Sequence, residues 1–387
     1  MRKRLVALFM GLALCLTGCA SAVTVEGDDN GAKEEAPGSE EKGSGEGEAA
    51  SEEAAGSAEQ DAAANETGDV GKEAGDGEEY HIGFVVHTTS GDVMSSIEYG
   101  AQAAADDYGV KLTYTGPVDS DNTEQISMFE SLVAAGCDAI VLIAGDPTVW
   151  DDPIQDAVDK GITVIVTDTD APTSARAAYF GVDTAKLAYD LGAAVREKTG
   201  DEGTVALGVC LLGPASHTTR AEKVQEAFDQ TDMEFIGVYE TEQDTTLNYN
   251  NWENIYTSNP ELAAMVGLSA LETTNMGKVK QTCGGDTVMA AYDPGTEALN
   301  LLEEGYLDVC AFQNVWMEGY LPVQAAARML KEGKKLAAEE NLYEGQIVTS
   351  EEVTEELKNR AQSEQTMNDW YRNYIKENGL ESFGLAD

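Results

Sequence analysis

The segment AIVLIAGDPTVWDDPIQDAVDKGITVIVT, residues 139–167, shows the pattern on which the fold prediction rests. Two continuous apolar runs, 139–143 and 163–167, flank a segment with helical periodicity near 154–160. Buried runs rich in β-branched residues that alternate with amphipathic helices are typical of parallel strands covered on both faces. The segment therefore predicts one strand–helix–strand unit.

The same alternation extends outward on both sides, from residue 80 to about residue 313. Further strands are predicted at 82–86, 111–115, 178–181, 205–212, 235–239, 264–268, 288–292 and 309–313. Helices are predicted between them, near 220–228, 248–257, 272–281 and 296–304 in the second half. The predicted fold class is α/β, with two doubly wound parallel-sheet lobes joined by a multi-strand hinge.

A helix near 320–330 is expected to return to the first sheet. We predict an N-terminal lobe of residues 80–182 plus 315–341 and a C-terminal lobe of 183–314 plus 342–350. Residues 351–387 form a charged helical tail. Its aromatic residues at helical spacing are expected to pack against the body, with a partner-docking helix as the alternative.

The first 19 residues have the features of an export signal. Arg2, Lys3 and Arg4 precede an apolar run from Leu5 to Leu16, which is short for a membrane span. The run ends in Leu-Thr-Gly-Cys at Cys19, which resembles the bacterial lipoprotein box and implies lipidation of that cysteine. The alternatives are an ordinary secretory signal with an incidental cysteine, or a short buried helix.

Residues 20–79 are predicted to be a disordered acidic linker. They carry 19 acidic residues against three lysines and no aromatic residue. Such a composition cannot bury enough apolar surface to offset the entropy of ordering. The linker would hold the folded body away from the membrane, at its extracytoplasmic face or on the periplasmic side if an outer membrane exists.

Charge and cysteine content exclude several classes of function. The 387 residues carry 24 Lys and Arg against 71 Asp and Glu, for a net charge of -47. This charge repels nucleic acid and disfavours docking of the folded body on anionic lipid. Four cysteines, at positions 137, 210, 283 and 310, form no Cys-x-x-Cys pair. Cys210 and Cys310 lie in predicted strands and are expected to be core residues, with a disulfide or metal site as the alternative. No cofactor and no metal are predicted.

Ligands of open α/β sheets bind beyond the carboxyl ends of the strands. In this chain those loops carry carboxylates, hydroxyls and amides, and they lack a glycine-rich phosphate loop. One carboxylate accepts hydrogen bonds from two adjacent sugar hydroxyls, while an aromatic ring covers the C–H face of the sugar. The loops therefore predict a neutral, hydroxyl-rich ligand in a cleft between the lobes.

The chain resembles the type I periplasmic binding proteins, the ribose/galactose/rhamnose class of ABC-importer receptors, over about residues 80–350. The resemblance is carried by residues 86–90 with 99–102, 161–165 before Asp168, 292–293 before 304–305, and 311–314 before 319–320. It implies that Asp168, Asp293 and Gln313 bind the sugar, with Ser90 in a position that is Asn in ribose receptors. The dipeptide Gly116-Pro117 and residues 168–170 look more like the rhamnose or furanose-signal branch, in which Arg220 faces the ligand. The ribose-type alignment would instead place Val224 at the position of this arginine.

Departures from the ribose pattern concern the aromatic residues and one arginine. Val93 and Met94 occupy the positions of the paired aromatic residues of ribose receptors. Thr169 occupies the position of the arginine that follows the first aspartate. Trp150 and Trp316 lie at rim and hinge, where they would stack on the ligand or pack in the core. For the other candidates the alternatives are local: a cap or turn role for the two aspartates, and backbone contacts for Gln313.

The sequence thus predicts a lipid-anchored, monomeric solute receptor. It would close on a carbohydrate-like molecule by hinge motion and deliver it to ABC permease subunits. The alternative is a sugar or quorum-signal sensor that presents its closed form to a membrane kinase or chemoreceptor. An enzyme such as a glycoside hydrolase ranks last, because no nucleophile–base motif is evident.

Overall fold

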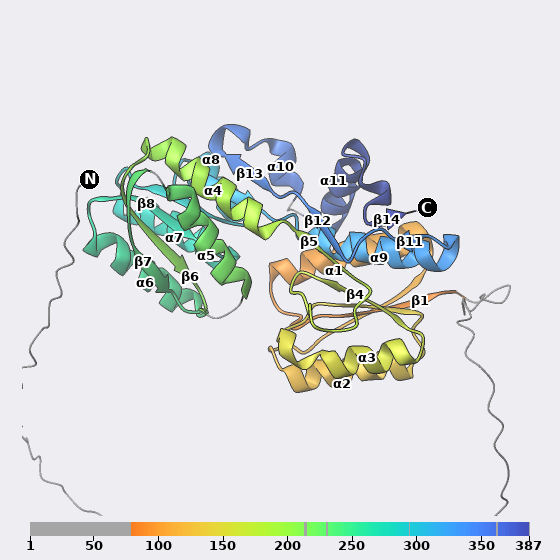
Figure 1. Ribbon diagram of the computed structural model, residues 1–387. Helices are drawn as coiled ribbons and strands as arrows, with labels where there is room; N and C mark the ends of the chain where they lie inside the picture. Colours follow the sequence, from red (N-terminus) through yellow and green to blue (C-terminus); the bar gives the residue numbers. More distant parts are fainter. Residues whose placement is uncertain (1–78, 213–214, 230, 294, 361–362, 387) are drawn as a thin grey trace, which may run out of the picture. The chain divides into compact units, whose positions relative to one another are not determined.

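The computed structural model describes residues 79–212, 215–229, 231–293, 295–360 and 363–386 (Figure 1). The predicted signal peptide at 1–19, the predicted lipidation site Cys19 and all of the predicted linker except Glu79 lie outside the described residues.

The first sheet has six strands in the order β12-β5-β4-β3-β1-β2, and every neighbouring pair is parallel. Helices α1 and α9 cover one face of this sheet, and α2 and α3 cover the other (Figure 1). The elements are β1 (His81–Val85), α1 (Asp92–Tyr108), β2 (Lys111–Thr115), α2 (Asn122–Ala134), β3 (Ala139–Leu142), η1 (Pro147–Val149), α3 (Asp151–Asp159), β4 (Thr163–Thr167), β5 (Ala178–Val182), α9 (Trp316–Glu332) and β12 (Glu340–Tyr343).

The second sheet has the order β13-β10-β9-β8-β6-β7. Helices α4 and α5 pack on one face, and α6, α7 and α8 pack on the other. The elements are α4 (Thr184–Thr199), β6 (Glu202–Val209), α5 (Ala215–Phe228), β7 (Asp232–Glu240), α6 (Thr245–Ser258), β8 (Leu262–Gly267), α7 (Ala270–Cys283), β9 (Val288–Tyr292), α8 (Thr296–Glu303), β10 (Val309–Phe312) and β13 (Gln346–Thr349). The prediction of two doubly wound lobes is confirmed. Strand β13, which pairs antiparallel with β10, and helix α4 were not predicted.

The described chain passes between the two sheets at the ends of β5, β10 and β12. Strand β12 belongs to the first sheet as far as Tyr343, so the last crossing follows that residue rather than residue 341. Gly345 lies in this crossing, where a Cβ atom would approach the Phe312 carbonyl oxygen to 2.8 Å and a Leu187 methyl group to 2.6 Å. Only glycine fits there without displacing the neighbouring strand.

Helices α1 and α9 are in direct backbone contact. A Cβ atom on Gly100 would overlap the carbonyl oxygen of Trp316, and one on Gly319 would overlap that of Ile97. The buried face of α1, which includes Gly100 and Ala101, is the face that packs here. The two glycines therefore set the position of the first turn of α9 relative to the first sheet.

The C-terminal segment packs against both lobes. Its elements are β11 (Lys335–Leu336), η2 (Ser350–Glu352), α10 (Glu355–Arg360), α11 (Glu364–Glu377), η3 (Leu380–Ser382) and β14 (Leu385–Ala386). Tyr371 of α11 stacks on Trp316 of the first lobe, with ring centroids 4.9 Å apart. Arg360 of α10 lies over the Phe312 ring of the second lobe, 4.5 Å from its centroid. Among the described residues, no helix has the length and apolarity needed to cross a membrane.

Candidate functional site

Asp168 directly follows β4 of the first sheet. Its backbone lies in the left-handed region, with φ of 57°, and its carbonyl oxygen accepts a 2.7 Å hydrogen bond from the Tyr179 hydroxyl. The preceding Thr167 is buried, and its hydroxyl donates to the carbonyl oxygen of Glu318, 3.0 Å away. These bonds hold the loop after β4 against the first turn of α9.

Asp293 has the equivalent place after β9 of the second sheet. Its φ is 48°, and its backbone N–H donates to Ala311 of the adjacent β10 at 2.7 Å. Gln313 holds the carboxylate through two hydrogen bonds, one of 2.8 Å from its backbone N–H and one from its side-chain amide. The carboxylate is therefore fixed by the segment that crosses back to the first lobe.

Arg220 points at the same group of residues from α5. Its guanidinium donates to the carbonyl oxygen of Leu268 at 2.8 Å and to Gln313 Oε1 at 2.5 Å. Its Cζ atom lies 4.4 Å from the centroid of the Tyr292 ring. Val224, the other candidate for this position, is fully buried in the core. Helix α5 begins at Ala215, so Arg220 lies within the helix and not at its start.

The backbone is unusual at this group of residues. Asp168, Asp293 and Asn314 are three of the five non-glycine residues with positive φ among those described, and all three end strands or begin a crossing. Asp and Asn adopt this conformation at lower cost than other residues, and such conformations concentrate at ligand sites. The geometry thus turns both aspartates out of their strands toward the loop edge.

The charges of the two lobes act on one another. Burial raises the pKa of the Asp168 carboxyl above its ordinary value of 3.8, and His87 and Arg220 oppose that shift. Burial also raises the pKa of Asp293, while Arg220 and the hydrogen bonds from Gln313 oppose it and the charge of Asp168 adds to it. Arg220 therefore acts electrostatically on one aspartate from each lobe.

The structure does not bring Ser90 into this group. Its side chain is exposed, and its hydroxyl donates to the carbonyl oxygen of Val118 at 2.8 Å. Thr88 donates to the same carbonyl at 2.7 Å. In this structure Ser90 ties the loop after β1 to the loop after β2.

Neither predicted stacking tryptophan is available to a ligand. Trp150 is fully buried and packs edge-on against Phe129, with ring centroids 5.4 Å apart. Trp316 is also fully buried between Tyr320 and Tyr371 and donates from Nε1 to Asn368 at 2.7 Å. The core alternative is correct for both, because each indole is fully buried among packed side chains.

Sequence reasoning missed one acidic residue of the site. Glu318, in the first turn of α9, is only 2% exposed, and its Oε2 atom has no hydrogen-bond partner. Burial raises the pKa of its carboxyl well above the ordinary value of 4.5, and the charges of Asp168 and Asp293 raise it further. An isolated acid within the apolar run Val315–Val323 was the available signal, but the helix was predicted to begin only near residue 320.

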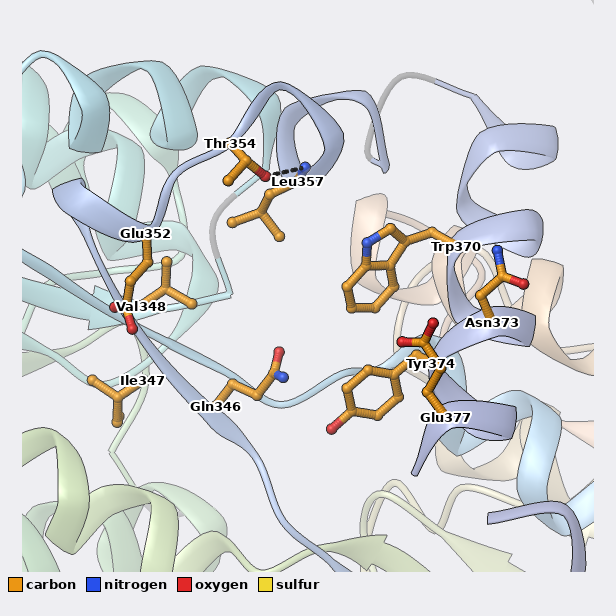
Figure 2. Close-up of a pocket in the computed structure, with 10 residues that line it drawn as sticks. All are labelled: Gln346, Ile347, Val348, Glu352, Thr354, Leu357, Trp370, Asn373, Tyr374 and Glu377. Atoms are coloured by element: carbon orange, nitrogen blue, oxygen red, sulfur yellow. Dashed lines mark hydrogen bonds between the residues drawn. The ribbon is translucent and has the colours of Figure 1, made fainter. Parts of the chain in front are cut away.

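A separate cavity lies between the second lobe and the C-terminal helices. It has a volume of about 580 Å³ and is lined from β13 by Gln346 and Val348 and from α11 by Trp370 and Tyr374, among others (Figure 2). None of its lining residues belongs to the aspartate group, so it does not mark the predicted ligand site. The described residues hold no group of three or more His, Cys, Asp or Glu side chains arranged to bind a metal ion.

Two α/β lobes with strand-end aspartates facing from each are the architecture of a type I periplasmic binding protein. Residues 82–335 match the periplasmic binding protein domain, and the chain belongs to that family. Lobe architecture and family match together confirm the resemblance read from the sequence.

The relatives of this chain are sugar-binding proteins. The xylose/arabinose-binding protein XylF of Sulfolobus acidocaldarius is 23% identical over 266 residues, which cover 64% of this chain and 65% of that protein. The ribose import binding protein RbsB of Bacillus subtilis is 23% identical over 68% of this chain and 85% of its own length. The solved structure of GanP, a glucose-galactose binding protein from Geobacillus stearothermophilus, is 26% identical with a TM-score of 0.65, covering 71% of this chain and 99% of GanP. These relatives are binding proteins rather than enzymes.

Proposed function

We propose that this protein captures a sugar-like ligand between its lobes and delivers it to an ABC importer. The observation that carries the proposal is the pairing of Asp168 after β4 with Asp293 after β9, with Arg220 acting on both. Each carboxylate can accept hydrogen bonds from adjacent hydroxyls, and Gln313 and Arg220 supply donors. Contacts to both lobes favour a closed arrangement, because the ligand binds that arrangement more tightly.

Binding to purified protein tests this proposal. A thermal-shift screen with pentoses, hexoses and polyols should raise the melting temperature for at least one sugar, since a ligand that binds only the folded state stabilises it. Asp168→Asn and Asp293→Asn should each weaken that binding about tenfold or more, because a charged acceptor is lost. Asp159→Asn is the control, since Asp159 is exposed and pairs only with Gln155 of its own helix. Unchanged binding in both site variants would overturn the assignment.

Transport is preferred over sensing because the name of the relative RbsB describes an import binding protein. Presentation of the closed form to a membrane kinase or chemoreceptor would use the same motion. A deletion strain that loses uptake of the bound sugar supports import. A strain that keeps uptake but loses transcriptional or tactic response to the sugar supports the sensor.

Membrane attachment through Cys19 is part of the same proposal. The basic residues 2–4, the apolar run and the terminal cysteine support it, and the acidic linker supplies the distance to the folded body. Labelled fatty acid should be incorporated into the wild-type protein and not into Cys19→Ser. Equal labelling of both would exclude Cys19 as the lipidated residue.

A further inference from the structure

The floor of the candidate site carries more negative charge than its single arginine balances. Asp168, Asp293 and Glu318 are three carboxyl groups, and Arg220 is the guanidinium that acts on all of them. Arg220 donates its hydrogen bonds to neutral acceptors, the Leu268 carbonyl and the Gln313 amide. Fully ionised, this group would have a net charge of about -2, which is costly away from water.

Glu318 is placed to act on a ligand held by the two aspartates. Its backbone carbonyl is bonded to Thr167, the residue directly before Asp168. Along the chain, α9 starts three residues after Gln313, which holds Asp293. Glu318 is therefore tied to the first aspartate by a hydrogen bond and to the second by the crossing segment.

The Glu318 carboxyl also has unused hydrogen-bonding capacity. Its Oε2 atom has no partner although the residue is 2% exposed. Tyr343 of β12 lies beside it, yet the Tyr343 hydroxyl also lacks a partner with good geometry. A buried carboxyl oxygen without a donor costs about 1–3 kcal/mol, so such atoms in a binding site point to a donor supplied by the ligand.

We propose that Glu318 is a third ligand-facing carboxyl and that the site prefers a sugar carrying a protonated amine over its neutral counterpart. This inference rests on the proposed sugar-binding function. An ammonium group supplies three donors and one positive charge, which matches an unpartnered carboxylate in a site of excess negative charge. The remaining hydroxyls of such a ligand suit the two aspartates.

The ionisable side chains around Glu318 do not balance the negative charge of the three carboxyl groups. The ionisable side chains that act on Glu318 or are acted on by it are Asp168, Asp293, Arg220, Tyr343, Tyr179 and Tyr371. Arg220 is the one cation in this set, and the tyrosines remain neutral at physiological pH because burial raises the pKa of their hydroxyls.

Matched ligand pairs test the inference directly. Calorimetric titrations at pH 6.5 would compare glucose, galactose and mannose with their 2-amino derivatives and with the uncharged N-acetyl forms. We expect the amine to bind about tenfold more tightly than its parent sugar, and the N-acetyl form to lose that gain, as for a charge-assisted hydrogen bond. Parent sugars that bind as tightly as the amines would overturn the inference and leave the proposed sugar-binding function intact.

Variants test whether Glu318 is the residue that causes the preference for the amine sugar. Glu318→Gln keeps the shape and removes the charge, so the ratio of the amine's affinity to the parent sugar's affinity should fall about tenfold. Glu130→Gln on the exposed side of α2 should leave both unchanged. A preference that survives in Glu318→Gln would overturn the role of this residue. Absence of binding by every sugar, charged or neutral, would contradict the proposed function itself.

Discussion

Gln313 and Asp293 are joined by two hydrogen bonds, one from the backbone N–H at 2.8 Å and one from the side-chain amide. The carbonyl end of the same amide accepts from Arg220. One neutral side chain therefore links the carboxylate after β9 to the guanidinium of α5 and orients both. Because Gln313 begins the crossing to α9, this link also ties the site to the hinge.

Replacing Gln313 by alanine removes one donor to Asp293 and the acceptor of Arg220. We expect sugar affinity to fall about tenfold to a hundredfold, because two charged groups lose a fixed partner. Calorimetric titration with the sugar identified by the screen measures this. Gln102→Ala is the control, since Gln102 is exposed and bonds only to Asp106 of its own helix. Equal affinities in the two variants would show that Gln313 does not orient the site.

Gly319→Ala should strongly destabilise the protein. The added methyl group overlaps the backbone of α1 at Ile97, and backbone cannot move aside as a side chain can. We expect a loss of about 3 kcal/mol or more in the free energy of unfolding, measured by chemical denaturation. Gly295→Ala, whose Cβ meets nothing within 4 Å, should cost much less. A mild effect at Gly319 would mean that α1 and α9 can separate at little cost.

Removing the Glu318 charge should stabilise the empty protein at neutral and alkaline pH. A carboxyl whose pKa is higher in the folded state makes folding take up protons between the ordinary value of 4.5 and the raised one, so stability falls as pH rises through that window. Glu318→Gln removes this penalty. Its advantage in unfolding free energy should be near zero at pH 4.5 and should grow as the pH rises toward 8.

Chemical denaturation from pH 4.5 to 8, with Glu130→Gln as the control for loss of a surface charge, measures this difference. A variant that loses stability relative to wild type as the pH rises would contradict the assigned environment of Glu318.

The contact of α11 with the hinge should contribute to stability. Tyr371 lies nearly parallel to Trp316, at 2°, and its hydroxyl donates to Asn314 at 3.3 Å. Tyr371→Ala should lower the free energy of unfolding by about 3–5 kcal/mol, as expected for truncating a buried aromatic residue. Tyr189→Ala, at a side chain that is 40% exposed, should change it by far less. Similar losses in both variants would show that α11 packs only loosely.

Much of the fold was predictable from local pattern. Apolar runs such as 139–143 and 163–167 form parallel strands because their residues are buried on both faces, and this burial leaves a readable signature. The strand-end positions of Asp168 and Asp293 follow from the same pattern. Helix α4 was missed between two predicted strands.

The two short strands with mixed polarity, β12 and β13, could not be recognised from the sequence. Strand β12 alternates exposed and buried residues, and β13 is only partly buried, so neither resembles the continuous apolar runs of the sheet interiors. Their placement depends on edges offered by β5 and β10, residues far away in sequence. The antiparallel orientation of β13 is likewise a property of the assembled sheet.

Sequence by itself determined the two lobes, the family and the strand-end aspartates. Strands buried on both faces of a sheet form continuous apolar runs, and the ends of these runs can be recognised from local composition. Tertiary structure alone decided which polar side chains meet. It buried Trp150 and Trp316 in hydrophobic cores, kept Ser90 on an exposed loop, and added Glu318 to the aspartates. The physical reason is that the electrostatic environment of a side chain depends on what distant segments pack around it, and spacing along the chain does not record that.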